Sequence, residues 1–358
     1  MNSYERFIKA LKKQEPDKVP IWELIIDRPV IEKLHGNISY LDFVELEDID
    51  GVTVFEDYDR KNMGNDFYID DWKLIWKMEQ NGCLFPYDGP IKNYKDFKGY
   101  NIPNPDLESK YDSLKEAVKR FKGEKAIIFL AHETFEYSHY LFGGMDKVFI
   151  KYITEPDFVK EVLDLIWSYK SRVIKNAIEM GADVICTGDD YASRMGPLIS
   201  QEHFREYVLP YLKKAVDITH EGGSYLIKHT DGKLWKIIDD IIGVGIDALD
   251  PIEPLAEMDI GKVKSKYGDK ICVVGNIDCG MLLPMGTKEE VREAVKETIA
   301  KAAPGGGYIM ASSNSIHSAV DPENYKAMIK AARKYGRYPI DEDLIKEYSN
   351  KNYMKRFM

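Results

Sequence analysis

Five short apolar segments recur along the C-terminal two thirds of the chain, with polar residues directly after each one. They are residues 184–186, 225–227, 246–249, 271–274 and 308–310. Continuous apolar runs of this length are typical of parallel strands that are buried on both faces. The stretches between them have the amphipathic periodicity of helices. The pattern therefore predicts repeated strand–loop–helix units, that is, an α/β fold around a parallel sheet.

The polar residues that follow these segments carry most of the chemically useful side chains. The clusters are Thr187–Asp190, Lys228–Gly232, Asp250–Pro251, Gly275–Asp278 and Ala311–Asn314. When parallel strands close into a TIM (β/α)8 barrel, all their carboxyl ends open onto one rim, and active sites lie there. We therefore expect a TIM (β/α)8 barrel whose functional site is formed by these clusters.

The first third of the chain is less regular. A helix is predicted over residues 3–13 and strands over 52–55 and 126–130. Residues 58–105 are rich in aromatic and charged side chains, and we expect them to form an N-terminal excursion with a hairpin that covers the barrel mouth. Because no low-complexity linker or internal repeat interrupts the pattern, residues 1–358 are predicted to form a single domain.

Composition narrows the choice of partners and compartment. A net charge of −10 argues against nucleic acid and against anionic membrane surfaces as partners. The chain has no apolar run near 18 residues and no apolar stretch at its N-terminus, so a cytoplasmic protein is predicted. The four cysteines, Cys83, Cys186, Cys272 and Cys279, lack CxxC spacing, which suits free thiols in a reducing compartment.

Several short motifs follow one another in an order that resembles a known family. They are Glu5–Phe7, Asp17–Pro20, Leu141–Gly144, Thr154–Pro156, Leu198–Ser200, Phe204–Tyr211, Gly275–Asp278, Gly286–Thr287 and Pro322–Asn324. The stretch from 198 to 211 is the most specific of them. Together they resemble the uroporphyrinogen decarboxylase superfamily, whose members are TIM barrels.

The resemblance implies one of two chemistries. One branch of the superfamily decarboxylates the acetate side chains of uroporphyrinogen without a cofactor. The other moves methyl groups to or from a corrinoid protein or a thiol, usually with zinc. The decarboxylase branch carries an arginine-rich segment after the first strand, because its substrate bears eight carboxylates. The matching segment here, Glu23–Arg28, has one arginine and two acids. Placing a polyanion beside uncompensated carboxylates is costly, so the methyltransferase branch matches better.

The methyltransferase branch also implies a metal site. Its members typically have His-x-Cys after the fifth strand and a second Cys after the eighth, together binding Zn²⁺. In this chain His229 and Asp231 occupy the first motif, and Asn314 falls near the second cysteine. The resemblance thus implies an altered zinc site with His229 and Asp231 as ligands. The third ligand stays open among His317, Glu133 and Cys279.

Nitrogen and oxygen ligands suit polarisation of an ether oxygen or an amine better than activation of a thiol. This favours a donor-side enzyme that takes a methyl group from a small methylated substrate, such as a methoxylated aromatic (O-demethylation), and passes it to a corrinoid protein. Reduced cobalt supplies the nucleophile, and the protein must align the donor and protonate or coordinate the leaving atom.

The candidate residues fall into three groups. The candidate catalytic residues are Glu133, Asp189, Asp190 and His229. The candidate substrate-binding residues are Glu23, Tyr191, Arg194, Asn276 and Asn314. The candidate metal ligands are His229, Asp231 and His317. Strand alternation predicts that one of Asp189 and Asp190 faces the barrel mouth and the other faces outward.

Plainer interpretations remain open. His229 and Asp231 can also serve within a strand–helix turn, where Asp231 would cap the next helix. A cofactor-independent decarboxylase acting on a less anionic acid is an alternative function. A non-enzymatic relative that binds a small molecule is another. The sequence leaves the methyl donor, the metal and the oligomeric state open, with a homodimer among the possible assemblies.

Overall fold

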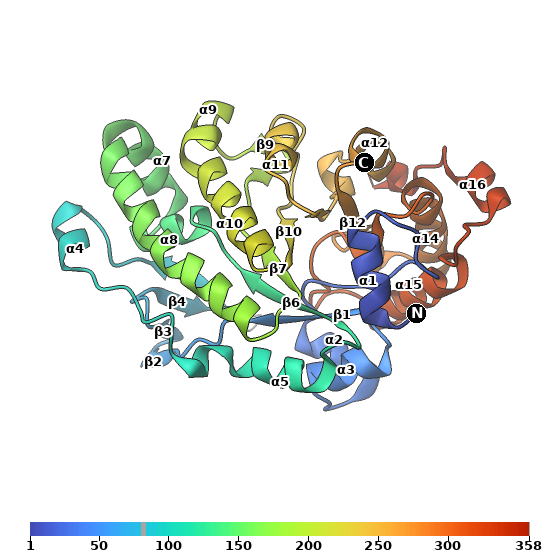
Figure 1. Ribbon diagram of the computed structural model, residues 1–358, viewed down its shortest axis with the longest axis horizontal. Coiled ribbons are helices and arrows are strands. Elements are labelled where there is room, and N and C mark those ends of the chain that lie inside the picture. The colour runs from blue at the N-terminus through green and yellow to red at the C-terminus, as the bar shows by residue number, and fades with distance from the viewer. Residues whose placement is uncertain (80–83, 358) are drawn as a thin grey trace.

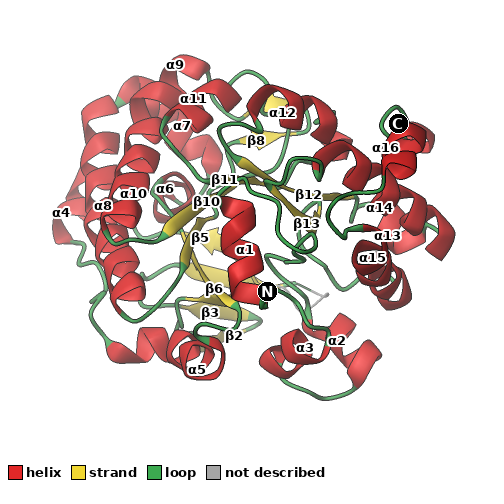
Figure 2. Cartoon of the chain, turned by 45° about the vertical axis from the view of Figure 1, so that its right-hand side comes forward, coloured by secondary structure: helices red, strands yellow, loops and turns green. Residues whose placement is uncertain are grey.

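The main sheet of the computed structural model, which describes residues 1–79 and 84–357, has seven parallel strands in the order β1-β6-β7-β10-β11-β12-β13. The strands are β1 (Gly51–Phe55), β6 (Ala126–Ala131), β7 (Val184–Thr187), β10 (Tyr225–His229), β11 (Ala248–Asp250), β12 (Cys272–Ile277) and β13 (Tyr308–Ser312). Figures 1 and 2 show this sheet curled inside a layer of helices. The prediction of an α/β fold built from strand–loop–helix units is confirmed, although the strand expected at 246–249 is displaced toward Asp250.

The two edges of the sheet are joined by a short extended segment, residues 20–22. The Trp22 amide donates to the Met310 carbonyl of β13 over 3.0 Å, and the Met310 amide donates to the Pro20 carbonyl over 2.9 Å. On the other side, the Asp50 amide next to β1 donates to the Ile21 carbonyl over 2.9 Å. The segment therefore takes the place of a further strand, and the architecture is compatible with a TIM-like barrel.

Helices surround the curled sheet. Their bounds are α1 (Ser3–Leu11), α2 (Arg28–His35), α3 (Tyr40–Leu46), α4 (Tyr94–Gly99), α5 (Asp112–Phe121), α6 (Phe135–Phe142), α7 (Met145–Thr154), α8 (Pro156–Glu179), α9 (Gln201–His203), α10 (Leu209–Glu221), α11 (Ile238–Gly243), α12 (Ile260–Tyr267), α13 (Leu282–Met285), α14 (Lys288–Ala302), α15 (Pro322–Tyr335) and α16 (Glu342–Tyr348). Local sequence sets several of their starts. Capping boxes begin α1 at Asn2, α3 at Ser39 and α14 at Thr287. None of the helices in the described ranges is long and apolar enough to cross a membrane.

A compact apolar cluster fills the interior of the curled sheet. Phe7 and Leu11 of α1 pack there with Trp22, Ile128 and Ile227. The rings of Phe7 and Trp22 are perpendicular, with their centroids 6.2 Å apart. The Tyr4 amide donates to the Glu124 carbonyl just before β6, so α1 lies at the amino ends of the strands. Because α1 fills that end, only the carboxyl ends remain for a site.

The excursion forms a second, antiparallel sheet in the order β2-β3-β4-β5. Its strands are β2 (Lys61–Gly64), β3 (Phe67–Ile69), β4 (Ile75–Met78) and β5 (Leu84–Asp88). The expected hairpin is thus part of a four-stranded sheet, while its role as a cover for the barrel mouth stays a prediction. Cys83 lies outside the described residues. Cys186, Cys272 and Cys279 are buried free thiols.

Candidate active site

A cavity of about 740 Å³ opens at the carboxyl ends of the parallel strands. Its walls come from the loops after the strands, and Leu84 and Phe85 of β5 also contribute. The ionisable side chains that line it are Asp27, Arg194, Asp231, Glu253, Asp278 and His317. The wall is therefore mainly acidic, and among the described residues Arg194 is its one arginine or lysine. This rim cavity lies where the strand pattern predicted the site.

His229 is the central residue of this rim. It ends β10, is 6% exposed, and has its Nδ1 2.6 Å from Oδ2 of Asp250 at the end of β11. Its Nε2 lies 3.6 Å from Oδ1 of Asp231. Ligand atoms of Asp190, His229 and Asp231 all lie within 4.8 Å of one another. The fold thus assembles three of the predicted side chains around one point.

The protonation of this group follows from burial and close charges. Although burial disfavours the charged ring, Asp250, Asp231 and Asp190 raise the pKa of His229 to about 9. Burial and the neighbouring Asp190 raise the pKa of Asp231 to about 7. The Asn314 amide donates to Oδ2 of Asp231, whereas the buried Oδ1 has no hydrogen-bond partner among residues 1–79 and 84–357. A buried acceptor of this kind is suited to receive a proton or a cation.

The same three side chains fit a divalent metal ion. One imidazole nitrogen and two carboxylates form a three-ligand nitrogen–oxygen set, which leaves a position open for substrate. Because Asp250 holds the Nδ1 side of His229, Nε2 faces Asp190 and Asp231, which is the usual orientation of a metal-binding histidine. Asp190, His229 and Asp231 are therefore the residues that would hold the ion.

The other two ligand candidates in the rim cavity do not join this group. Nε2 of His317 donates to the carbonyl of Cys279 over 2.9 Å, and its Nδ1 accepts from the Ala319 amide over 3.3 Å. The Cys279 thiol lies 3.4 Å from the Ser313 hydroxyl, and burial raises its pKa to about 12. Both nitrogens of His317 thus have backbone partners, one in the loop after β12 and one in its own loop, and Cys279 remains a thiol.

The adjacent acids after β7 have different neighbours. Asp190 belongs to the His229 group, and its Oδ1 accepts from the Asp231 amide over 3.3 Å. Asp189 is fully buried and accepts from His132 Nδ1 at 2.9 Å and from three backbone amides, those of Glu133, Phe135 and Glu136, at 2.7–3.3 Å. Burial opposes its ionisation, yet His132 and Lys228 hold the pKa of Asp189 well below its usual range. Asp189 therefore anchors the start of α6 instead of lining the cavity.

Glu133 forms a buried ion pair with Lys228, a residue that the sequence did not single out. Lys228 Nζ lies 3.0 and 3.1 Å from the two carboxylate oxygens of Glu133 and donates to the Asp189 carbonyl over 2.9 Å. It also lies 4.0 Å from the ring centroid of Tyr191. Glu133, Tyr191 and Lys228 are all buried. None of the three lines the rim cavity, and the available signal was a single lysine directly after an apolar run.

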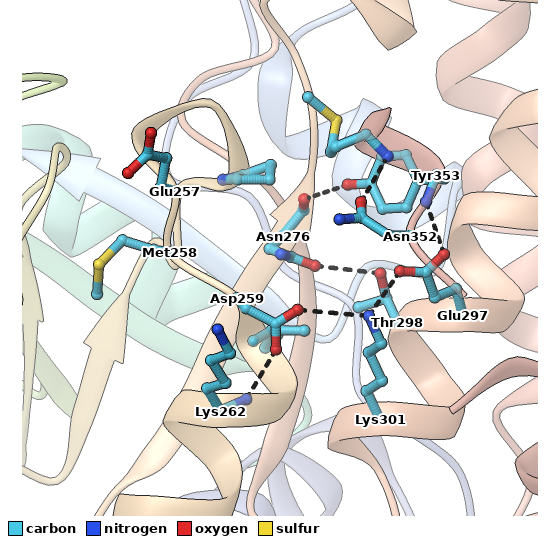
Figure 3. Close-up of a pocket in the computed structure, with 13 residues that line it drawn as sticks. Glu257, Met258, Asp259, Lys262, Asn276, Glu297, Thr298, Lys301, Asn352 and Tyr353 are labelled. Carbon is cyan, nitrogen blue, oxygen red and sulfur yellow. Dashed lines mark hydrogen bonds and ion pairs between the residues drawn. The ribbon is translucent and has the colours of Figure 1, made fainter. Parts of the chain in front are cut away.

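Two further candidates are tied into the barrel wall. Glu23 is 1% exposed and accepts from the amide and hydroxyl of Ser312 at 3.1 and 2.6 Å. Burial raises its pKa to about 8. Asn276 faces away from the rim, where its Oδ1 accepts from the Thr298 hydroxyl over 3.1 Å and its carbonyl accepts from the Tyr353 hydroxyl over 2.8 Å (Figure 3). It lines a separate pocket of about 280 Å³ between α12, α14 and the C-terminal turn.

Arg194 and Asn314 lie in the rim cavity as expected. Arg194 Nε donates to Glu253 over 3.1 Å, and Glu253 also accepts from the Gly232 amide over 2.9 Å. Of the proposed substrate-binding residues, the structure therefore places Arg194 and Asn314 together in the cavity wall. Tyr191, Glu23 and Asn276 lie elsewhere. Asp250, a direct partner of His229, is the other residue that the sequence did not select.

Comparisons with known proteins agree on the family. The model of the family "Uroporphyrinogen decarboxylase (URO-D)" matches residues 77–335. A uroporphyrinogen decarboxylase of Pseudoalteromonas atlantica is 24% identical over 367 residues, which cover 94% of this chain and 98% of that protein. The enzyme of the same name from Aeromonas salmonicida is 26% identical over 260 residues, 69% and 70% of the two chains.

A solved structure supports the fold. A methyltransferase from Methanosarcina mazei superposes with a TM-score of 0.73 at 20% sequence identity, covering 94% of this chain and 99% of that one. At this identity the likeness concerns the architecture alone. Because the family model spans most of the chain, the protein belongs to the uroporphyrinogen decarboxylase (URO-D) family.

Proposed function

We propose that this protein is a methyltransferase that moves a methyl group from a small methylated donor, such as a methoxylated aromatic, to a corrinoid protein. The observation that carries the proposal is the group formed by Asp190, His229 and Asp231. Asp231 lines the rim cavity, the group includes the histidine of the methyltransferase motif, and the buried Oδ1 of Asp231 lacks a hydrogen-bond partner among the described residues. A nitrogen–oxygen site of this kind suits activation of an ether oxygen or an amine.

The charge of the cavity supports the same choice. Asp27, Asp231, Glu253 and Asp278 line it, whereas Arg194 is the one arginine or lysine in its wall over the described part of the chain. A substrate with eight carboxylates would meet mainly like charge there, at a large electrostatic cost. A small neutral or singly charged donor would not. The architecture shared with the Methanosarcina mazei methyltransferase adds further support.

The chain's own residues have defined tasks in this reaction. The bond between the methyl carbon and the donor oxygen or nitrogen breaks, its electrons stay on the heteroatom, and that atom takes up a proton. In the metal-free site His229 can deliver this proton from Nε2, because the surrounding carboxylates keep the ring protonated. With a metal ion bound, Nε2 would be a ligand and the proton would come from solvent. A divalent ion such as Zn²⁺, when bound by Asp190, His229 and Asp231, would polarise the same heteroatom. The corrinoid, when present on its partner protein, supplies the nucleophilic cobalt.

The remaining parts of the proposal concern the mouth. Leu84 and Phe85 line the rim cavity, so we propose that the sheet β2–β5 covers part of the mouth and limits the access of water. Arg194 and Asn314 would contact the donor. The whole chain, residues 1–358, is proposed to act as one domain.

An anaerobic assay tests the proposal. The protein, reconstituted with Zn²⁺, is mixed with cob(I)alamin and pooled methoxyaromatics and methylamines, and the loss of cob(I)alamin absorbance is followed. We expect donor-dependent loss with the wild type and little with His229→Ala. His35→Ala, which removes a histidine paired with Glu47 on a different part of the barrel, should behave like the wild type. No conversion, also with a corrinoid protein as acceptor, would contradict the proposal.

The names of the curated relatives favour one alternative, a cofactor-independent decarboxylase. With this acidic cavity its substrate would be less anionic than uroporphyrinogen. Release of carbon dioxide from a small carboxylic acid without any cobalt compound would select this reading. Tight binding of a small molecule without turnover would instead indicate a non-enzymatic relative.

A further inference from the structure

Asp250 is held against His229 through both its side chain and its backbone. The two residues are paired in the parallel register of β10 and β11. Asp250 is 3% exposed, and its Oδ2 lies 2.6 Å from Nδ1 of His229. Its carbonyl accepts from the amide of Thr230, the residue after His229, over 2.8 Å. Register and hydrogen bonds therefore fix Asp250 relative to the imidazole ring.

This contact decides which nitrogen of His229 is available. A carboxylate 2.6 Å from Nδ1 accepts the proton of that nitrogen, so Nδ1 is the donor in the neutral ring as well. The lone pair of the neutral ring then lies on Nε2, on the side of Asp190 and Asp231. We infer that Asp250 is a positioning residue that aims Nε2 of His229 at a divalent cation between Asp190 and Asp231. This inference rests on the proposed function, because it concerns the metal site of that reaction.

The charge of Asp250 needs an explanation beyond packing. An asparagine would fill the same space and accept the same hydrogen bond without burying a charge, and buried charges are costly. A carboxylate behind a metal-binding histidine makes the imidazole a stronger ligand as well as orienting it. Glu253, the next acid along the chain, contacts Arg194 and Gly232 instead. Of these two acids, it is Asp250 that contacts the imidazole of His229.

Co²⁺ provides a direct test, because its visible absorption reports both occupancy and ligand geometry. The full-length protein, freed of metal, is titrated with Co²⁺ as wild type, Asp250→Ala and Asp250→Asn. We expect Asp250→Ala to bind Co²⁺ about 10- to 100-fold more weakly, with an altered absorption band. Asp250→Asn should lose less, because its amide oxygen still accepts from Nδ1 but carries no charge.

Glu47→Gln is the matched control. Glu47 is a largely buried carboxylate 2.7 Å from Nε2 of His35, so its removal alters a histidine–carboxylate pair of the same kind away from the rim cavity. Its Co²⁺ affinity should equal that of the wild type. Circular dichroism checks the folding of each variant. If Asp250→Ala does not fold, the Co²⁺ affinity of Asp250→Asn is compared with that of the wild type.

Two results would overturn the inference. One is wild-type affinity and an unchanged spectrum in both Asp250 variants. The other is an absence of Co²⁺ binding by the wild-type protein. In that second case the methyl-transfer assay still decides the proposed function separately, because His229 can act there as a proton donor without a metal ion.

Discussion

The ammonium of Lys228 lies 3.0 and 3.1 Å from the two carboxylate oxygens of Glu133, and neither side chain reaches solvent. Two charges removed from water in this way stabilise one another only as a pair, because either one alone would be buried without compensation. Lys228 lies in β10 and Glu133 follows β6, so the ion pair links two segments of the main sheet close to His229.

Loss of one member of this pair should cost more than loss of both. We expect Lys228→Met to lower the free energy of unfolding by about 3–5 kcal/mol. Combining Lys228→Met with Glu133→Gln should recover part of this loss, because no charge is then left unpaired. Urea titrations of both single variants and the double variant measure the coupling. Simple additivity of the two single effects would show that the charges act independently.

His132 should titrate well above an ordinary histidine. Burial alone would lower its pKa, but Glu136 and Asp189 raise it to about 9. Asp189→Asn removes one of these carboxylates, so the pKa of His132 should fall in that variant. The measurement is an NMR titration of the histidine ring signals. Asp190→Asn is the control: it changes the adjacent acid, which does not contact His132, and should leave the pKa of His132 unchanged. An equal shift of the His132 pKa in both variants would refute the role of Asp189.

Glu23 should make the protein less stable as pH rises. Burial raises its folded-state pKa from 4.5 to about 8, so between these values the folded chain keeps a proton that the unfolded chain has lost. Its contribution is complete below pH 4.5 and is lost as pH approaches 8, with a total of up to roughly 5 kcal/mol. Glu23→Gln should flatten the dependence of unfolding free energy on pH in this window.

The control for Glu23 is Glu32→Gln, which changes an exposed glutamate on α2. It should leave the pH dependence of the wild type unaltered. Denaturant titrations at several pH values between 4.5 and 8 compare the three proteins. If Glu23→Gln kept the wild-type slope, the carboxyl group would not be protonated in the folded protein.

Phe7 should be a major contributor to barrel stability. It is fully buried against Trp22 at the amino end of the strands, so Phe7→Ala leaves a cavity in the barrel interior. We expect a loss of about 3–5 kcal/mol in unfolding free energy. Phe85→Ala is the matched control, because the Phe85 side chain is half exposed and its loss should change stability little. Thermal or denaturant unfolding compares the two variants. Equal losses of stability would contradict the packing of α1 into the interior of the curled sheet.

Local patterns were sufficient for the framework of the molecule. Apolar runs marked the strands β7, β10, β11, β12 and β13, because strands buried on both faces have no polar alternation. Several of the polar residues after them line the rim cavity, although Asn276 faces away from it.

Side-chain contacts between different strands could not be predicted from local hydrophobic patterns. Asp250 meets His229 through the register of β10 and β11, and Lys228 meets Glu133 across 95 residues of sequence. Asn276 follows the apolar run 271–274 and lies in β12, yet its side chain faces α14. These pairings depend on strand register and on the curl of the sheet, which no local pattern contains.

The sequence by itself therefore determined the α/β framework, the rim that bears the candidate site, and His229 and Asp231 as members of that site. Only the tertiary structure decided which side chains surround His229. It also decided which acids bind helix amides or form ion pairs, and which candidate residues face away from the rim. The physical reason is that strand formation responds to local hydrophobicity, whereas a site depends on distances of a few ångströms between residues remote in the chain.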